Sequence, residues 1–161
     1  HYGGLYFDFD IILLKNFENL LGTEFCYNWS NLSKNGNNGL IRFYKKSDEL
    51  LKLMDKYNIT FEKNKHNKWQ IYTTHEVLYT DYLNIMCFPC TMFDPVWILF
   101  DSNEKSKYSK LSNFDDFFKK TDENIDNFFD NQIYCYHWHS RNDTYVEENS
   151  YYDKYEKKFK L

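Results

Sequence analysis

The sequence predicts an α/β domain in which a mixed sheet is flanked by helices. Three observations support this class: short apolar runs bounded by polar residues, an amphipathic segment directly after one of them, and an aromatic run near the C-terminus. Alternation of strand and helix patterns is typical of α/β folds. With 161 residues the chain has the length of one domain, so we expect residues 1–161 to form a single domain.

The N-terminal third of the chain predicts strands and one helix. The runs "GLYFD" (4–8) and "IILLK" (11–15) have the apolar content of short strands. "NGNNG" (35–39) is a turn cluster, and "LIRFY" (40–44) is a third strand. A helix over 46–57 follows, with Ser47 as its expected cap. The apolar face of this helix is expected to contain Leu50, Leu51, Met54 and Tyr57.

The remaining elements are predicted from shorter patterns. We expect a polar loop over 64–70, a helix over 73–85, an extended segment over 93–100, one or two short surface helices over 112–130, a strand over 133–139 and a polar terminal helix over 144–160. The extended segment is predicted because the residues before Pro89 and Pro95 avoid the helical basin. The terminal helix is expected to carry Tyr145, Tyr152, Tyr155 and Phe159.

Composition argues against two classes of function. The formal net charge is −4, the lysines are dispersed, and arginine occurs only at Arg42 and Arg141. Phosphate backbones are recognised by clustered basic side chains, so no nucleic-acid partner is predicted. A membrane-spanning helix needs about 18 or more consecutive apolar residues. The sequence has no such run, so we predict no membrane span within this chain.

The four cysteines, Cys26, Cys87, Cys90 and Cys135, include one C-x-x-C, "CFPC". A four-thiolate zinc site usually draws on two such pairs. A redox-active pair usually lies at a helix N-terminus, whereas "NIMCFPCTMF" predicts a strand that runs into a loop. Buried thiols, a structural disulfide and metal or redox chemistry therefore stay open as alternatives.

An acidic pair, Asp8 and Asp10, follows the first apolar run. Two carboxylates near one point at the end of a strand can bind a hard divalent cation and a diphosphate together. Gly3 and Gly4 leave no side chain beside this strand, so that another backbone or a ligand can approach. The offsets after Asp8 do not match a calcium-binding EF-hand loop. A solvated turn is the alternative for the acidic pair.

The stretch "YGGLYFDFDIILLKNFENLLG" resembles the D-x-D core of the sugar-binding glycosyltransferases of family 32, in particular the α-1,4-galactosyltransferase and α-1,4-N-acetylglucosaminyltransferase group. Four further segments are similar to that family in order and approximate spacing: "NNGLIRFYKKSDELLKLM", "MFDPVW", "YCYHWHS" and "ENSYYDKY". The resemblance covers nearly the whole chain and implies a GT-A-like fold. It also implies that this chain is the C-terminal part of such an enzyme, with the metal motif and the acceptor half but without the nucleotide-binding half.

The resemblance implies retaining transfer of a sugar from a nucleotide-sugar, expected to be UDP-linked, to a glycan, glycolipid or glycoprotein acceptor. Mn²⁺ (or Mg²⁺) at the D-x-D offsets the charge of the leaving diphosphate. Asp10 is implied as the direct metal ligand, Asp8 as the water- or ribose-linked partner, and His137 as the third ligand. Gly3 and Gly4 are implied beside the bound cofactor.

The roles of other residues follow less directly from the resemblance. His139 is a reserve ligand, because residues two apart share a face of a regular strand. The candidates for the reaction-face group are Glu76, Asp81 and Asp94. The candidates that line an acceptor sugar are Asn38, Trp97, Trp138 and Tyr44. The sequence departs from the family at "THEVLYT", where the family carries a Gly-Pro turn before a helix.

Alternative functions and roles stay open. A haloacid-dehalogenase phosphatase also begins with a strand and D-x-D, but the expected Gly-Asp motif is absent here. A non-catalytic or degenerate relative that binds a glycan or a metal is the second candidate function. His137 is alternatively a packed core residue, and Glu76 an exposed residue in the first turn of a helix. The sequence does not specify a compartment: a eukaryotic member would lie in the Golgi lumen, and a viral or bacterial one in the cytoplasm.

Overall fold

The computed structural model describes residues 2–30, 35–64, 82–97, 111, 113–127, 132–139 and 143–159. The chain divides into two compact units. The first unit contains His1–Phe9 and Asn16–Cys90, and the second contains Asp10–Lys15 and Thr91–Leu161. Strands and helices are both present, so the predicted α/β class is confirmed. The expectation of a single domain over 1–161 stays a prediction.

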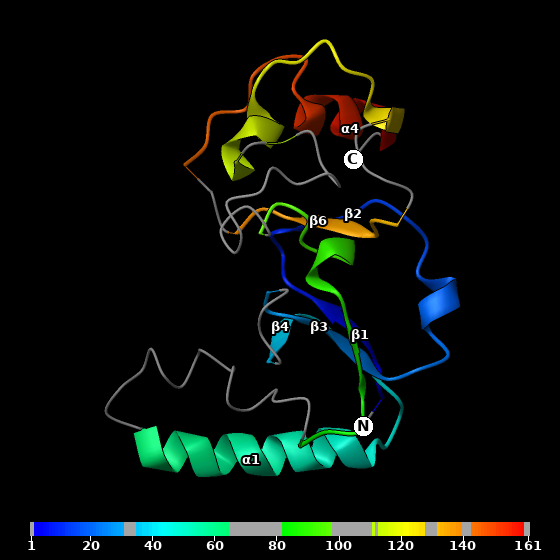
Figure 1. Ribbon diagram of the computed structural model, residues 1–161, viewed down its shortest axis with the longest axis vertical. Coiled ribbons are helices and arrows are strands. Elements are labelled where there is room, and N and C mark those ends of the chain that lie inside the picture. The colour runs from blue at the N-terminus through cyan, green and yellow to red at the C-terminus, as the bar shows by residue number, and fades with distance from the viewer. Residues whose placement is uncertain are drawn as a thin grey trace. The chain divides into compact units, whose positions relative to one another are not determined.

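The first unit is built on a mixed four-stranded sheet (Figure 1). Its strand order is β1-β4-β3-β5, with β1 at Gly4–Phe7, β4 at Gly36–Phe43, β3 at Phe25–Asn28 and β5 at Met86–Phe88. The β1–β4 and β3–β4 pairs are antiparallel, and β3 and β5 are parallel. A short 3-10 helix, η1, spans Glu18–Leu20. The predicted strands over 4–8 and 40–44 are therefore confirmed.

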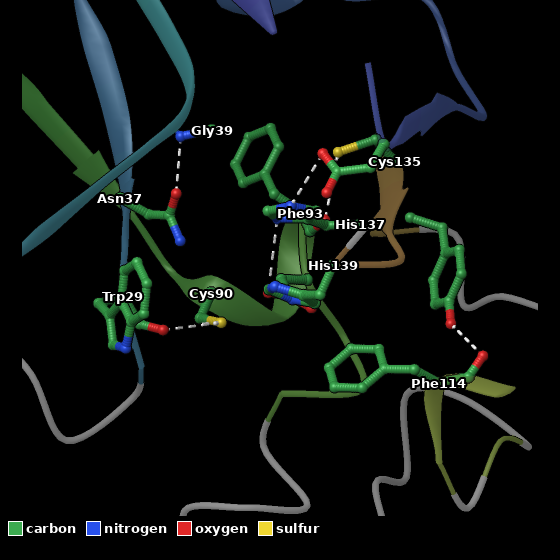
Figure 2. A network of polar contacts seen from close by, with 12 residues as sticks. Trp29, Asn37, Gly39, Cys90, Phe93, Phe114, Cys135, His137 and His139 are labelled. Carbon is green, nitrogen blue, oxygen red and sulfur yellow. Dashed lines mark hydrogen bonds and ion pairs between the residues drawn. The ribbon is translucent and has the colours of Figure 1, made fainter. Parts of the chain in front are cut away.

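The predicted turn over 35–39 is wrong, because β4 already begins at Gly36. Asn37 lies opposite Tyr27 in the β3–β4 ladder and is buried. Its side-chain oxygen accepts a hydrogen bond of 2.7 Å from the backbone nitrogen of Gly39 (Figure 2). Pairing with β3, which includes a register shift between Phe25 and Tyr27, thus outweighs the local turn preference of Asn and Gly.

Helix α1 spans Asp48–Asn64 and confirms the predicted helix after the third strand. Ser47 caps it as expected, since its Oγ accepts a 3.0 Å hydrogen bond from the nitrogen of Leu50. The predicted face is wrong in part, because Leu51 and Met54 are exposed. Leu50 and Leu53 instead line a cavity of about 460 Å³ together with residues of β1 and β4. The inner face of α1 therefore contains Leu50 and Leu53, which are three residues apart, and not Leu51, which directly follows Leu50.

Strand β5 confirms the predicted strand at "NIMCFPCTMF", and a 3-10 helix, η3, follows at Cys90–Met92. No disulfide joins the four cysteines, all of which lie among the described residues. Cys87 pairs in register with Cys26 on β3, and their sulfurs are 3.8 Å apart. The close cysteine pair of the first unit is therefore Cys26–Cys87 rather than the two cysteines of "CFPC".

Mild oxidation is expected to cross-link Cys26 to Cys87. A hydrogen bond from Cys26 lowers the pKa of the half-buried Cys87 thiol, whereas burial raises the pKa of the Cys135 thiol. Cys87 therefore has more thiolate at neutral pH and reacts first with an alkylating reagent. Peptide mass spectrometry after oxidation with glutathione disulfide tests this, with Cys90→Ser as the matched control. Loss of the cross-link in Cys90→Ser would contradict the expected pairing.

The second unit pairs two short strands, β2 and β6 (Figure 1), and its core is largely aromatic. Strand β2 (Ile11–Leu13) is antiparallel to β6 (Cys135–His137). The helical elements are η4 (Phe114–Phe118), η5 (Ile125–Asn127) and α4 (Tyr151–Phe159). One cluster of buried core residues in this unit contains Val96, Leu111, Phe114, Phe117, Phe118, Tyr136 and Tyr151. The strands predicted from "IILLK" and "IYCYHWH" are confirmed, each shorter than expected.

Two predictions for the second unit need correction. The short helices over 112–130 exist, but they are not confined to the surface, because Phe114, Phe117 and Phe118 of η4 are buried. The segment over 93–100 is not extended over its described residues. It turns after Asp94, where the nitrogen of Trp97 donates a 3.2 Å hydrogen bond to the Asp94 carbonyl. Asp followed by Pro is a favoured start for a β-turn, and this local preference prevails.

The C-terminal helix is confirmed over part of its predicted range. Helix α4 begins at Tyr151, and Ser150 Oγ accepts a 3.2 Å hydrogen bond from the Asp153 nitrogen. Tyr145 lies before the helix and is exposed. The first residue of the loop predicted over 64–70, Asn64, is instead the last residue of α1. Residues 65–70, and residues 73–81 of the helix predicted over 73–85, lie outside the described residues. Residues 82–85 are described and are not helical. Among the described residues, no helix has the length and hydropathy needed to cross a membrane.

Candidate metal centre

The pairing of β2 with β6 brings Asp10 and His137 together within the second unit. Ile11 lies opposite His137 in the antiparallel register. The nitrogen of Trp138 donates a 3.0 Å hydrogen bond to the carbonyl of Asp10, which extends the ladder by one step. An acidic residue directly before β2 therefore lies beside a histidine at the end of β6.

The side chains of Asp10 and His137 face one another. His137 Nε2 lies 3.3 Å from Asp10 Oδ1. Both side chains are largely shielded from solvent, with 7% of His137 and 13% of Asp10 exposed. An imidazole nitrogen and a carboxylate oxygen at this distance can form an ion pair, share a proton or bind one cation.

A second carboxylate, that of Asp94, lies near both His137 and His139. Asp94 is completely buried at the turn before Pro95. Its Oδ2 is 2.7 Å from His139 Nε2 and 3.9 Å from His137 Nδ1. Strand β6 ends at His137, and His139 has a positive φ of 53°, so the regular alternation assumed for the pair 137 and 139 does not apply.

Aromatic rings surround His139. The centroids of the His137 and His139 rings are 3.8 Å apart, and the planes differ by 18°. Trp97 and Phe114 lie against His139 with centroid distances of 4.9 Å and 4.6 Å. The predicted sugar-stacking residue Trp97 is thus half-buried beside the site. The other predicted stacking residue, Trp138, packs on Phe118 at 5.4 Å.

The donor atoms fit a divalent cation by two criteria. Carboxylate oxygens and neutral imidazoles are common ligands of such ions. Two donors that each bind an ion at about 2.1 Å are separated by roughly 3 Å, which agrees with the 3.3 Å between Asp10 Oδ1 and His137 Nε2. Asp94, His137 and His139 also offer donor atoms that lie within 4.8 Å of one another. The described residues therefore include Asp/His groups that could bind a metal ion.

Among its described residues, the first unit contains five other predicted site residues: Gly3, Gly4, Asp8, Asn38 and Tyr44. Asp8 follows β1; its nitrogen donates a 2.8 Å hydrogen bond to the Gly39 carbonyl, and its Oδ1 accepts one of 2.6 Å from Tyr6. Gly3 and Gly4 have positive φ values of 68° and 126°. Asn38 is half-buried on β4. The metal, cofactor and substrate roles of these residues stay predictions.

Two candidate residues lie outside the described residues. In addition, the contact of Asp94 with the histidines was not predicted from the sequence. Glu76 and Asp81 are not among the described residues. Asp94 was expected only as a reaction-face group, whereas it lies next to the histidine pair. The sequence features that could have indicated this contact are the Asp-Pro pair at Asp94 and the later H-x-H sequence. A sequence pattern does not show that Asp94 and His139, 45 positions apart, lie in contact.

The chain matches no protein-family model, no curated protein and no solved structure in the comparisons made. The chemistry of the site is therefore derived from its own donor atoms.

Proposed function

We propose that the chain is the metal-binding and acceptor part of a glycosyltransferase with a GT-A-like fold. In this proposal the enzyme moves a sugar, with retention, from a UDP-linked nucleotide-sugar to a glycan, glycolipid or glycoprotein acceptor. The observation that carries this proposal is the position of the D-x-D residue Asp10, 3.3 Å from the buried His137. A solvated turn would leave the Asp10 carboxylate in water, whereas Asp10 is 13% exposed and faces a buried histidine.

Asp10 and His137 are the residues that would hold Mn²⁺ or Mg²⁺. When bound, such an ion supplies positive charge that offsets the negative charge of a departing nucleoside diphosphate. Asp8, two residues before Asp10, is the proposed second carboxylate of the motif. The low exposure of Asp10 and His137 favours this role, because partial exclusion of water strengthens charge interactions.

The order of motifs along the chain supports the same proposal. Asp10 and His137 come from the two segments, "YFDFD" and "YCYHWHS", that carry the resemblance to the family 32 enzymes. The residues directly after Asp10, Ile11–Leu13, pair with Cys135–His137 in the β2–β6 ladder. A resemblance in two distant segments is more specific when the segments adjoin in the fold than when they lie apart.

Calorimetric titration of Mn²⁺ and then UDP into the full chain tests this proposal. We expect Mn²⁺ to bind and UDP to bind more tightly in its presence. Asp10→Ala should weaken Mn²⁺ binding by about 100-fold or more, since loss of a partner of a metal ligand alone costs about 10- to 100-fold. Asp122→Ala is the matched control, because Asp122 is an exposed aspartate of the same unit.

The outcomes separate the two candidate functions. Metal-dependent UDP binding that is lost in Asp10→Ala supports the transferase. Metal binding without any effect on UDP supports a non-catalytic metal- or glycan-binding relative. Equal binding by the wild type and Asp10→Ala would show that the acidic pair is not the metal site.

A further inference from the structure

Two cysteines face one another at the centre of the short parallel ladder between β3 and β5. The register pairs Cys26 with Cys87, and one further residue pair flanks them on each side. Neighbouring strands of a sheet lie about 4.8 Å apart. A disulfide needs Cα atoms that are about 4.4–6.8 Å apart. The backbone can therefore accept a bond between these two sulfurs while β3 and β5 stay paired.

The side chains of this pair are already in contact in the reduced chain. Cys26 Sγ donates a 3.8 Å hydrogen bond to Cys87 Sγ, and Cys87 Sγ donates one of 3.1 Å to Asn28 Oδ1. The three side chains thus lie together beside the β3–β5 ladder. Rotation about the Cα–Cβ bond of one or both cysteines is the movement that brings the sulfurs to the bonded distance of about 2.05 Å.

The two thiols differ in their access to solvent and in their acidity. Cys26 is completely buried, whereas Cys87 is half-buried, so a reagent from solution can reach Cys87 but not Cys26. The hydrogen bond from Cys26 lowers the pKa of the Cys87 thiol. The same hydrogen bond, together with burial, raises the pKa of Cys26. Cys87 is therefore the thiol that reacts first, and Cys26 is placed to react with it afterwards.

We propose that Cys26 and Cys87 form a reversible thiol–disulfide switch in which Cys87 exchanges with a small-molecule disulfide, Cys26 resolves the adduct, and the new bond locks β5 to β3. First, the Cys87 thiolate attacks one sulfur of R–S–S–R, forms Cys87–S–S–R and releases one thiolate, which takes up a proton. Cys26 then gives up its proton to water, attacks Cys87 Sγ and expels the second thiolate. The two cysteines lose two electrons, and one R–S–S–R becomes two R–SH.

Formation of the adduct makes the second step easier. The first cause of the raised pKa of Cys26 is its hydrogen bond to Cys87. In the adduct Cys87 carries no negative charge and is a weaker acceptor, so this cause is largely removed. Cys26 then yields its thiolate more readily, next to the sulfur that it attacks.

The bond would lock a strand that is held by few contacts. Strand β5 has three residues, and its contacts with β3 and the residue before it include a 2.8 Å hydrogen bond from the Met86 nitrogen to the Glu24 carbonyl and an edge contact between the rings of Phe25 and Phe88. The cross-linked cysteines are 61 positions apart in the chain. Closing a loop of this length disfavours the open chain by about 10³-fold in the chain-entropy model. The redox state would therefore set how readily β5 separates from β3.

Reaction of the reduced full chain with glutathione disulfide, quenched with acid and followed by peptide mass spectrometry, tests the order of the two steps. The wild type should form the Cys26–Cys87 disulfide, as should the control Cys90→Ser. In Cys26→Ala, glutathione should remain on Cys87. If this variant does not fold, the wild-type time course must show glutathione on Cys87 before the cross-link. A Cys87–Cys90 disulfide, or a cross-link with no prior adduct on Cys87, would overturn the proposal.

Hydrogen exchange of the oxidised and reduced full chain tests the lock itself. Exchange in peptides from β3 and β5 should slow by about 10-fold or more on oxidation and return on reduction with dithiothreitol, while peptides from β6 and α4 serve as the reference. A cross-link that leaves exchange in β3 and β5 unchanged, or that dithiothreitol does not reverse, would refute the switch. These measurements need neither Mn²⁺ nor UDP, so their outcome is independent of the proposed function.

Discussion

Replacing Phe117 with alanine is expected to destabilise the second unit by about 3–5 kcal/mol. Phe117 is fully buried within the core cluster of this unit. Its ring stacks on Tyr136 of β6 with a centroid distance of 4.3 Å and lies 6.2 Å from Tyr151 and 6.1 Å from Tyr155. The substitution would remove ring contacts to β6 and α4 and leave a cavity that the surrounding rings cannot fill completely.

Hydrogen exchange measured by mass spectrometry tests this effect unit by unit. Peptides from β6 and α4 should lose protection in Phe117→Ala, while peptides from β3 and β4 serve as an internal reference. Phe159→Ala is the matched control: its ring is half exposed and stacks on Tyr155, so a change of about 1 kcal/mol or less is expected. Equal protection in the two variants would show that Phe117 does not organise this core.

The Phe117 substitution should also weaken the candidate metal centre. Tyr136 precedes His137 on β6, and Ile12 of β2 packs against the same cluster. A loosened cluster therefore loosens the ladder that sets Asp10 beside His137. Weaker Mn²⁺ binding in Phe117→Ala would indicate that the core positions the site, and this effect should be smaller than that of Asp10→Ala.

Elements with a clear local pattern were predicted from the sequence. Ser47 followed by an apolar and charged repeat is sufficient to predict α1 and its cap. The strands at β1, β2 and β6 were predicted because each is a short apolar or aromatic run. Their pairing was not predictable in the same way, since the register of β2 against β6 depends on packing between distant segments.

The errors arose where tertiary contacts outweigh local preference. "NGNNG" has turn chemistry, yet Asn37 and Gly39 lie in β4 because β3 supplies a partner strand. The phenylalanines of η4 were placed at the surface because acidic neighbours surround them in the sequence. In the fold Asn113 and Asp116 satisfy each other as a capping box, which leaves the aromatic side to the core.

The candidate site was predictable as a set of residue types but not as an arrangement. Asp10 and His137 were expected as ligands, and the distance between them is compatible with that role. Asp94 and His139 were each expected in another role, and their 2.7 Å contact follows only from the turn at Asp94 and the positive φ of His139. Such backbone details have no periodic signal in a sequence.

Replacing Gly3 with alanine is expected to destabilise the first unit by about 2–4 kcal/mol. Gly3 has a φ of 68°, a conformation that costs an L-residue about 1–2 kcal/mol. A Cβ at this position would also lie 2.5 Å from the carbonyl carbon of Tyr44, so backbone atoms after β4 would have to move. Gly22→Ala is the matched control, because Gly22 has no positive φ and a Cβ there meets no atom within 4 Å.

The Gly3 substitution distinguishes two reasons for a glycine beside the acidic motif. If Gly3 is required by the approach of the chain at Tyr44, hydrogen exchange in β1 and β4 should rise sharply in Gly3→Ala and stay near wild type in Gly22→Ala. If Gly3 instead leaves room for a ligand, protection should be retained while UDP binding in the presence of Mn²⁺ weakens. The short distance to the Tyr44 backbone favours the first result, since that contact exists without any ligand. The glycine pair would then be explained by the packing of β1 rather than by cofactor binding.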